Sequence, residues 1–307
     1  MFSIFNLVAI LIHTEGILEV FYINNTFDFV RPPVRDFANY TKSDGTPQAD
    51  IVTISGAYLS LDTEGIPFVN LSELSVTRED VKFLKSRGIV VLFSIFGSES
   101  VGWGCINPKF TWRVAWNLYN EVIEKWEADG IDIDDEGSTC HTNPHWFADL
   151  VWAIRGLFGS GHIIKKDLWD DYYIIPLIKN AIDFGSTMDY AITFEGLIQT
   201  YHYYINLGLL PRQILIGIQI GPETQAMPNM STILRICHWV VDNESGGLSE
   251  FNFASDTCQF TDDPQLSCPF PSPRDHRFMI EMSKCLGRTN FPPSLESLFK
   301  VRRSRIL

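Results

Sequence analysis

Acidic residues alternate with isoleucines in one short segment, residues 129–136, which reads Asp-Gly-Ile-Asp-Ile-Asp-Asp-Glu. Alternate side chains of a β-strand share a face, so Asp132, Asp134 and Glu136 point one way and the two isoleucines point the other. Buried carboxylates cannot all ionise, and coupled carboxyl groups are how an enzyme keeps one acid protonated at its working pH. The pattern therefore predicts acid–base catalysis, with Glu136, at the carboxyl end of the strand, as the proton donor.

Calcium binding is the structural alternative for an acidic segment of this kind. The apolar alternation and the absence of the EF-hand glycine spacing disfavour it, and no His/Cys cluster at zinc spacing occurs elsewhere, so no metal site is expected. Asp129 is out of phase with the other carboxylates. We expect it at a helix-to-strand turn, where it accepts backbone hydrogen bonds, with Gly130 as the residue that breaks the preceding helix.

Short apolar runs alternate with helical patterns along the 307 residues, which indicates parallel strands joined by crossover helices and a single (β/α)8 barrel. Isoleucines suit the helix side of a barrel strand, so the carboxylates would line its interior. Thr77 and Asp80 form the capping box of one helix, which ends at Gly88; further helices are expected at 110–128 and 147–158. Strands are expected at 17–23, 50–58, 89–94, 131–136, 188–194, 214–220 and 248–253, with an irregular fifth strand at 172–175 in a polar stretch.

The spacing of Asp129, Asp132, Asp134 and Glu136 resembles the Asp-x-x-Asp-x-Asp-x-Glu signature of glycoside hydrolase family 18. Its Asp-Asp-Glu ending is similar to that of Endo H-type endo-β-N-acetylglucosaminidases, and segments 21–25, 88–97, 189–191 and 251–253 extend the resemblance along most of the chain. The resemblance implies cleavage of the GlcNAc-β1,4-GlcNAc core of N-linked glycans, leaving one GlcNAc on the asparagine. It also implies catalysis assisted by the substrate's own N-acetyl group, without a cofactor.

The same resemblance implies roles for individual residues. Glu136 protonates the glycosidic oxygen, Asp134 orients the acetamide and stabilises an oxazolinium-like intermediate, and Asp132 tunes Asp134 electrostatically. Two motifs depart from the family pattern. Strand three carries Ser-Ile-Phe-Gly at 94–97 where Ser-x-Gly-Gly is common, and Met-Asp-Tyr-Ala at 188–191 lacks the final aspartate of Met-x-Tyr-Asp.

Three further residues are candidates for contact with substrate. Tyr190 is the candidate for the tyrosine that supports the acetamide, and Asn252 lies in the segment that resembles the eighth strand. Trp103 follows the third strand, where it either stacks on a sugar ring at the barrel mouth or packs within its loop.

Two other activities fit the same barrel. A chitinase would act on a GlcNAc polymer; the Asp-Asp-Glu ending and the missing aspartate favour the N-glycan enzyme over it. A non-catalytic lectin or inhibitor would typically lack the acid, so the intact Glu136 argues against it. The formal net charge of −13 disfavours nucleic acid as a partner, because an acidic surface repels phosphates.

The ends of the chain and its cysteines bear on its location. Residues 1–16 are either a signal peptide or a buried first segment, no stretch is apolar enough to span a membrane, and residues 291–307 form a polar, basic tail after a glycosidase domain at 17–290. Six cysteines and five Asn-x-Ser/Thr sequences favour a secreted or lumenal protein over a cytosolic one, and a monomer is expected. Six cysteines can pair in 15 ways. Their positions on the predicted barrel suggest one of these arrangements, with the bridges Cys105–Cys140, Cys237–Cys285 and Cys258–Cys268.

Overall fold

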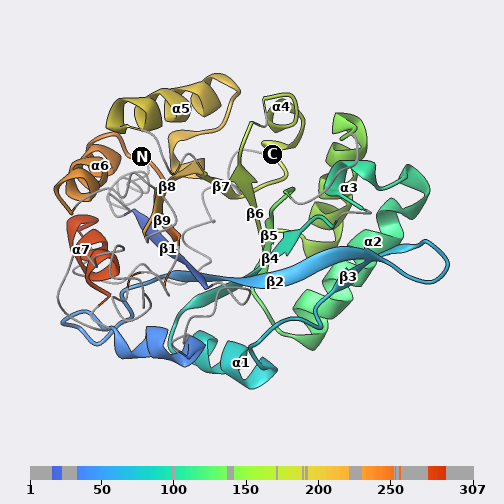
Figure 1. Cartoon of the computed structure of the whole chain (residues 1–307), viewed down its shortest axis with the longest axis horizontal. Coiled ribbons are helices and arrows are strands. Elements are labelled where there is room, and N and C mark those ends of the chain that lie inside the picture. Colours follow the sequence, from blue (N-terminus) through green and yellow to red (C-terminus); the bar gives the residue numbers. More distant parts are fainter. Residues whose placement is uncertain are drawn as a thin grey trace, which may run out of the picture.

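A closed barrel of parallel strands forms the centre of the molecule in the computed structural model (Figure 1). The structure describes residues 16–22, 33–98, 101–136, 142–170, 172–188, 190, 193–220, 230–251, 253, 256 and 276–287. The first strand, β1, pairs in parallel with both β2 and β9, which closes the ring. The strands are β1 (Ile17–Tyr22), β2 (Ile51–Leu61), β3 (Pro67–Asn70), β4 (Val90–Phe96), β5 (Gly130–Ile133), β6 (Ile163–Leu168), β7 (Phe184–Thr187), β8 (Ile214–Gln219) and β9 (Gly247–Phe251).

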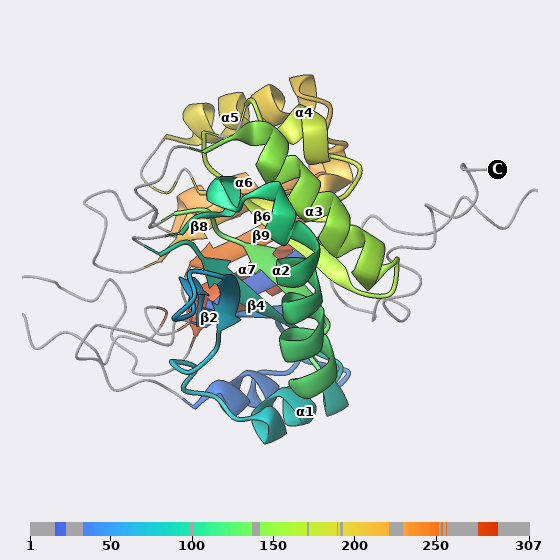
Figure 2. The ribbon, with the colours of Figure 1, turned by 90° about the vertical axis from the view of Figure 1, so that its right-hand side faces the viewer.

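Helices surround this barrel, and β3 is an additional strand that pairs antiparallel with the end of β2. Figure 2 shows α2 and α3 side by side on the outside of the barrel, where they contact each other. The predicted (β/α)8 fold is therefore confirmed, with β3 as an added strand. The α-helices are α1 (Arg78–Ser86), α2 (Thr111–Leu118), α3 (Pro144–Phe158), α4 (Ile175–Ile178), α5 (Phe194–Asn206), α6 (Met230–Asp242) and α7 (Arg277–Cys285).

Local sequence determines where several of these elements begin. Thr77 caps α1, and its side chain and that of Asp80 form the reciprocal pair of a capping box, as predicted. The helix expected at 110–128 is divided into α2 and a π-helical segment, η4 (Tyr119–Lys125). The apolar pattern that predicted one long helix does not report the wider hydrogen-bond spacing of its second half.

The barrel interior changes character from one end to the other. At the end where the strands begin, its side chains are apolar. They include Ile51, Val90, Leu92, Ile163, Phe184 and Leu215. One layer closer to the carboxyl ends of the strands, the interior contains charged groups, which are described below. This order places the polar part of the interior next to the barrel mouth, where active sites of such barrels lie.

The fifth barrel strand differs from the prediction. It is β6, at Ile163–Leu168, rather than residues 172–175. The stretch looked too polar for a barrel strand because it contains Lys165 and Lys166, yet both lysine side chains are fully buried. Lys165 lies among carboxylates of β1, β5 and β6, and Lys166 pairs with Asp135, which a single segment cannot reveal. The following helix, α4, spans only Ile175–Ile178, so the fifth βα unit is irregular, as expected.

The sixth barrel strand also differs from the prediction. It is β7, at Phe184–Thr187, which lies before the expected range 188–194. Thr193 caps α5, so the apolar end of the expected strand is the start of a helix. The true strand has no apolar run because it contains Gly185, which lies against β6: a Cβ atom there would be 2.6 Å from the carbonyl oxygen of Lys166.

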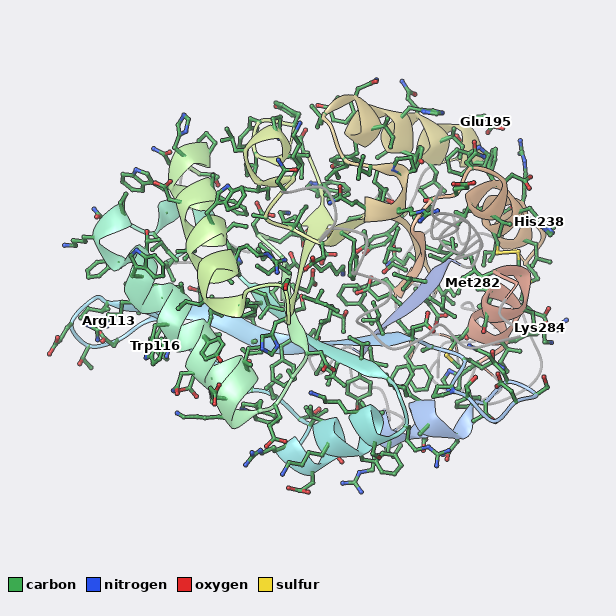
Figure 3. All side chains as sticks on the ribbon, turned by 180° about the vertical axis from the view of Figure 1, so that it is seen from behind. Arg113, Trp116, Glu195, His238, Met282 and Lys284 are labelled. Atoms are coloured by element: carbon green, nitrogen blue, oxygen red, sulfur yellow. A yellow bond between two sulfur atoms is a disulfide. The ribbon has the colours of Figure 1, made fainter. Side chains whose placement is uncertain are left out.

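One predicted disulfide is present in the structure. Cys237 of α6 is bonded to Cys285 of α7, with the two Cα atoms 6.2 Å apart, and the bond is visible beside His238 in Figure 3. Cys105 is also disulfide-bonded. Its predicted partner Cys140 lies outside the described residues, as do the predicted pair Cys258 and Cys268, the predicted signal peptide and the C-terminal tail. Across the described ranges, no helix has the length and apolar character needed to cross a membrane.

Candidate active site

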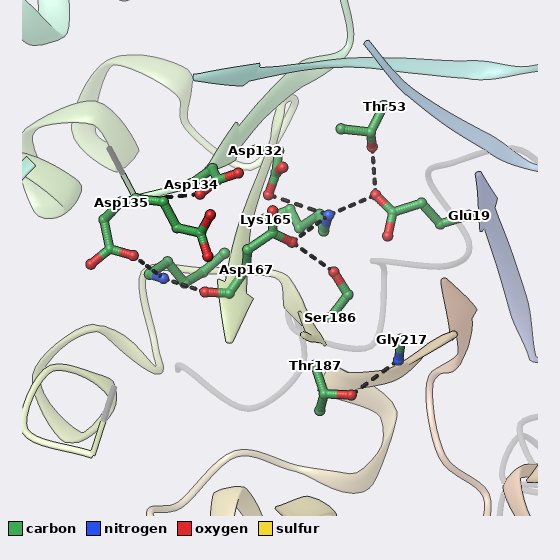
Figure 4. Close-up of polar contacts among 12 residues, drawn as sticks. Glu19, Thr53, Asp132, Asp134, Asp135, Lys165, Asp167, Ser186, Thr187 and Gly217 are labelled. Atoms are coloured by element: carbon green, nitrogen blue, oxygen red, sulfur yellow. Dashed lines mark hydrogen bonds and ion pairs between the residues drawn. The ribbon is translucent and has the colours of Figure 1, made fainter. Parts of the chain in front are cut away.

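The carboxylate row lies on the strand and in the phase that the sequence predicts. β5 directs Asp132 into the barrel, and Asp134 follows just beyond the end of the strand (Figure 4). Both are buried, with 0% and 4% of their surface exposed, whereas the intervening isoleucines, Ile131 and Ile133, belong to the core that includes the surrounding helices. The alternation therefore places polar side chains inside the barrel and apolar side chains on its outer face, under the helices.

Glu136 lies at the mouth of the barrel and is exposed to solvent. The prediction extended the strand to this residue, but β5 ends at Ile133. The segment nevertheless stays attached to the chain that follows β4, because the Gly97 N–H donates to the Glu136 carbonyl oxygen at 3.0 Å. The Glu136 N–H in turn donates to Oδ1 of Asp134 at 3.3 Å. These bonds hold the backbone of Glu136 against Gly97 and Asp134, while its side chain remains exposed to solvent.

A buried lysine on β6 lies against the carboxylate row. The Nζ atom of Lys165 lies 3.3 Å from Asp132 Oδ1, and its side chain is 0% exposed. The same Nζ lies 2.9 Å from Glu19 Oε1 of β1 and 2.8 Å from Asp167 Oδ1 of β6. Figure 4 shows the lysine between these carboxylates. One ammonium group is thus enclosed by three carboxyl groups from three strands.

Hydroxyl groups and an aromatic ring complete the surroundings of this lysine. Thr53 of β2 donates to Glu19 Oε1, and Ser186 of β7 donates to Asp167 Oδ1 at 2.8 Å. The Lys165 ammonium also lies 4.0 Å from the centre of the Phe21 ring, which is a cation–π distance. The polar interior is therefore cross-linked between non-neighbouring strands.

Sequence reasoning did not identify Lys165, Asp167 or Glu19 as part of the site. The sequence contained a signal for two of them, because Lys165 and Asp167 are two positions apart and so share a face of a strand. In the β5–β6 register Lys165 is paired with Asp132, so that shared face is the interior. Recognising it required knowing that residues 163–168 form a strand. Glu19 carries no such local signal.

Burial raises the proton affinity of the row. The pKa values of Asp132 and Asp134 lie well above the usual range, first because burial disfavours the charged form and second because Asp167 is negatively charged. Lys165 opposes the effect at Asp132, as Lys166 does at Asp134. Partial burial also raises the pKa of Glu136, with the charges of Asp167 and Asp135 as further causes and Lys166 opposing them. A carboxyl that keeps its proton closer to neutral pH can act as a general acid.

Tyr190 lies beside the row, half-buried, with its ring stacked on that of Phe251 of β9 at a centroid distance of 5.2 Å. Burial raises the pKa of its phenol well above the usual value, followed by the charges of Asp167 and Asp134. The hydroxyl is therefore a neutral donor near the carboxylates. This position is compatible with the substrate contact expected for Tyr190, while Asn252 lies outside the described residues.

Trp103 and the first residues of the motif have structural positions. Trp103 is 1% exposed and donates its indole N–H to the Ile95 carbonyl oxygen at 2.9 Å, so it packs within its loop and presents no face to a sugar. Asp129 lies at the helix-to-strand turn, where its Oδ2 accepts the Val91 N–H and its Oδ1 lies 2.9 Å from Lys85 Nζ. At Gly130 a Cβ atom would lie 2.1 Å from the Ile163 carbonyl oxygen, so close approach of β5 and β6 requires glycine.

Comparisons with known proteins bear on this fold. No protein-family model matches the chain, and no curated protein sequence matches it. The structure is similar to catalytic domain 2 of the Group II chitinase from Ostrinia furnacalis, with a TM-score of 0.65 and 14% identity over 91% of this chain and 98% of that one. It is also similar to an endo-β-N-acetylglucosaminidase from Cordyceps militaris, with a TM-score of 0.64 and 17% identity over 89% and 91%.

A third similar structure is the catalytic domain of a hyperthermophilic chitinase from Pyrococcus furiosus, with a TM-score of 0.65 and 15% identity over 90% of this chain and 97% of that one. At these identities the likeness shows a shared barrel fold. It does not by itself assign an activity, because one barrel fold can support many different chemistries.

Proposed function

We propose that this protein is a glycoside hydrolase of the family 18 type, which cleaves a β-linkage at an N-acetylglucosamine residue. The observation that carries the proposal is the placement of its Asp-x-x-Asp-x-Asp-x-Glu segment. Asp132 and Asp134 lie inside the barrel, and Glu136 lies above them at its mouth. Similar structures include chitinases and endo-β-N-acetylglucosaminidases, which agrees with this assignment.

The proposed reaction proceeds in two steps, each of which inverts the anomeric carbon. The protonated carboxyl of Glu136 gives its proton to the glycosidic oxygen while the acetamide oxygen of the substrate attacks the anomeric carbon. The glycosidic bond breaks, the leaving sugar departs as an alcohol, and a cyclic oxazolinium ion remains. Glu136, now a carboxylate, takes a proton from water, whose oxygen attacks the anomeric carbon. The ring opens and the configuration is retained.

The two buried aspartates act on the acetamide in this scheme. Asp134 orients the amide and balances the positive charge that develops on the oxazolinium ring, and its contact with the Glu136 N–H keeps the two groups together. Asp132, enclosed behind it, adjusts the charge on Asp134. Tyr190 donates a hydrogen bond to the acetamide oxygen. A low-dielectric interior makes each of these interactions stronger than it would be in water.

The substrate proposed is the GlcNAc-β1,4-GlcNAc core of N-linked glycans, with one GlcNAc left on the asparagine. The Asp-Asp-Glu ending at Asp134–Glu136 and the alanine at position 191 support this choice over chitin. The second candidate is a chitinase, because two of the similar structures are chitinases that align over most of this chain. An extracellular or lumenal location fits both, since the Cys237–Cys285 bond is stable in an oxidising compartment.

The decisive experiment compares wild type with Glu136→Gln on a high-mannose glycopeptide, with products identified by mass spectrometry. The N-glycan proposal predicts peptide carrying a single GlcNAc from wild type and none from the variant. Glu121→Gln, at a half-buried carboxylate of η4 that pairs with Lys125, is the matched control and retains activity. Cleavage of chitin oligomers alone would establish the second candidate, and sugar binding without cleavage of either substrate would identify a lectin.

A further inference from the structure

Asp167 is held in a fixed position on the inner face of the barrel. Its Oδ1 accepts the Ser186 hydroxyl at 2.8 Å and lies 2.8 Å from Lys165 Nζ, and the residue is 2% exposed. The lysine and the serine come from β6 and β7, so the carboxylate is fastened from two strands (Figure 4). A buried charge held in this way cannot rotate to follow the reaction.

The same part of β6 is attached to the segment that carries Glu136. In the β5–β6 register Ile133 pairs with Lys166, so Asp167 occupies the next position along β6, level with the end of the carboxylate row. Nζ of Lys166 lies 2.7 Å from Asp135 Oδ1 and also donates to the Asp167 carbonyl oxygen. This double contact connects the backbone of Asp167 to the neighbour of Glu136.

We propose that Asp167 is a positioning residue for the reaction: clamped by Lys165 and Ser186 and level with Asp134 in the β5–β6 register, it holds a fixed carboxylate beside the row that ends in Glu136. The inference rests on the proposed function only in taking Glu136 as the acid. Lys165 has a second task in this arrangement, because its ammonium lies 2.8 Å from Asp167 Oδ1 and compensates the buried carboxylate. The Lys165–Asp167 pair therefore forms a fixed arrangement of charges on β6, the strand next to β5.

The charged groups that face Glu136 are consistent with this role. Asp135 lies on its own segment, β6 contributes Lys166 and Asp167, and Asp134 and Tyr190 border the same space. Of the charges that raise the pKa of Glu136, that of Asp167 is the largest, and it is likewise the largest for Asp134 and Tyr190. Removing this charge should therefore lower the pH at which Glu136 loses its proton.

The test follows the ionisation of Glu136 directly, without substrate. Protein with ¹³C-labelled glutamate carboxyls is titrated by NMR, and the Glu136 signal is assigned by its disappearance in Glu136→Gln. Asp167→Asn is expected to lower the titration midpoint by roughly one pH unit. Ser186→Ala, which removes a contact to Asp167 but no charge, leaves the midpoint in place.

An unchanged or raised midpoint in Asp167→Asn overturns the proposal, as does an equal shift in Ser186→Ala. The double variant Lys165→Met/Asp167→Asn carries the same prediction and leaves no unpaired ammonium, so it replaces the single variant if that one does not fold. If wild type cleaves a GlcNAc substrate, the alkaline limb of its kcat/KM profile moves with the midpoint. A shifted midpoint in a protein that cleaves nothing upholds the role of Asp167 and refutes the proposed function alone.

Discussion

Two buried carboxyl groups, which lie on opposite faces of barrel strands, have different surroundings. Asp132 faces the interior and lies 3.3 Å from the Lys165 ammonium. Glu250 of β9 faces outward, where its register partners Val20 and Ile218 belong to the apolar core under the helices. Both carboxyls are completely buried, and burial raises the pKa of each well above its usual value.

The difference between them lies in the surroundings. Asp132 shares its lysine with Glu19 and Asp167, whereas neither carboxyl oxygen of Glu250 has a hydrogen-bond partner among the described residues. The charge that further raises the pKa of Glu250 is that of another carboxylate, Asp256, whose oxygens accept the N–H groups of Phe278 and Met279 in the first turn of α7. Burial thus raises the pKa of both carboxyls, but only Asp132 also has a compensating cation and belongs to a row that reaches the barrel mouth.

The largest expected effect is on activity and comes from the carboxyl at the mouth. Glu136→Gln removes the proton donor while leaving the buried groups in place, and we expect kcat/KM to fall about 10²–10⁴-fold. Glu250→Gln, an equal change at the outward carboxyl, leaves kcat/KM within about twofold. Steady-state kinetics on the cleaved substrate measures both, and equal losses would remove the functional distinction between the two sites.

The next effect is on stability and comes from the interior cation. Lys165→Met leaves three carboxyl groups without their shared ammonium, and we expect unfolding free energy to fall by about 3–5 kcal/mol. Urea denaturation followed by circular dichroism measures the change. A loss below about 1 kcal/mol would mean that the interior carboxyls are as independent of a cation as Glu250 is.

The outward carboxyl should give an effect of opposite sign. Glu250→Met replaces an unpartnered carboxyl in an apolar core, so we expect a gain of about 1–3 kcal/mol at neutral pH. The pKa of Glu250 in the folded state lies above its ordinary value of 4.5. Between these two pH values the folded state therefore binds a proton that the unfolded state has lost. Wild type therefore loses stability as pH rises above 4.5, and the gain from the variant should shrink on acidification to that pH. Denaturation of both proteins at neutral pH and at pH 4.5 checks this prediction. A gain in unfolding free energy that does not depend on pH would exclude ionisation of Glu250 as its cause.

The smallest expected effect on stability comes from a surface lysine, which serves as the reference for Lys165→Met. Lys125 lies 2.6 Å from Glu121 in η4, and 59% of its side chain is exposed. We expect Lys125→Met to lower the unfolding free energy by only about 0.3–0.5 kcal/mol, since solvent screens the pair. The same urea titration measures it. If this loss equalled that of Lys165→Met, burial of the interior lysine would contribute nothing to its importance.

Much of the fold and part of the site could be predicted because their signals are local. The capping box of Thr77 and Asp80, the strand at β4 and the alternating face of β5 each depend on neighbours within a few residues. The strand at β6 was missed because its lysines are typical of exposed positions. The partners of Lys165 include Glu19, which is more than 140 residues away in the sequence.

The sequence by itself determined which carboxyls share a face, because the period of a β-strand places Asp132 and Asp134 on one face and their isoleucine neighbours on the other. Only the tertiary structure decided how those carboxyls are charged. Closure of the barrel brings Glu19, Lys165 and Asp167 from separate strand positions to within a few ångströms of one another. Packing within its loop also buried Trp103, whose indole N–H donates to the Ile95 carbonyl oxygen. Charge interactions and burial depend on distance in space, and the pattern of one strand contains no information about what lies across the barrel.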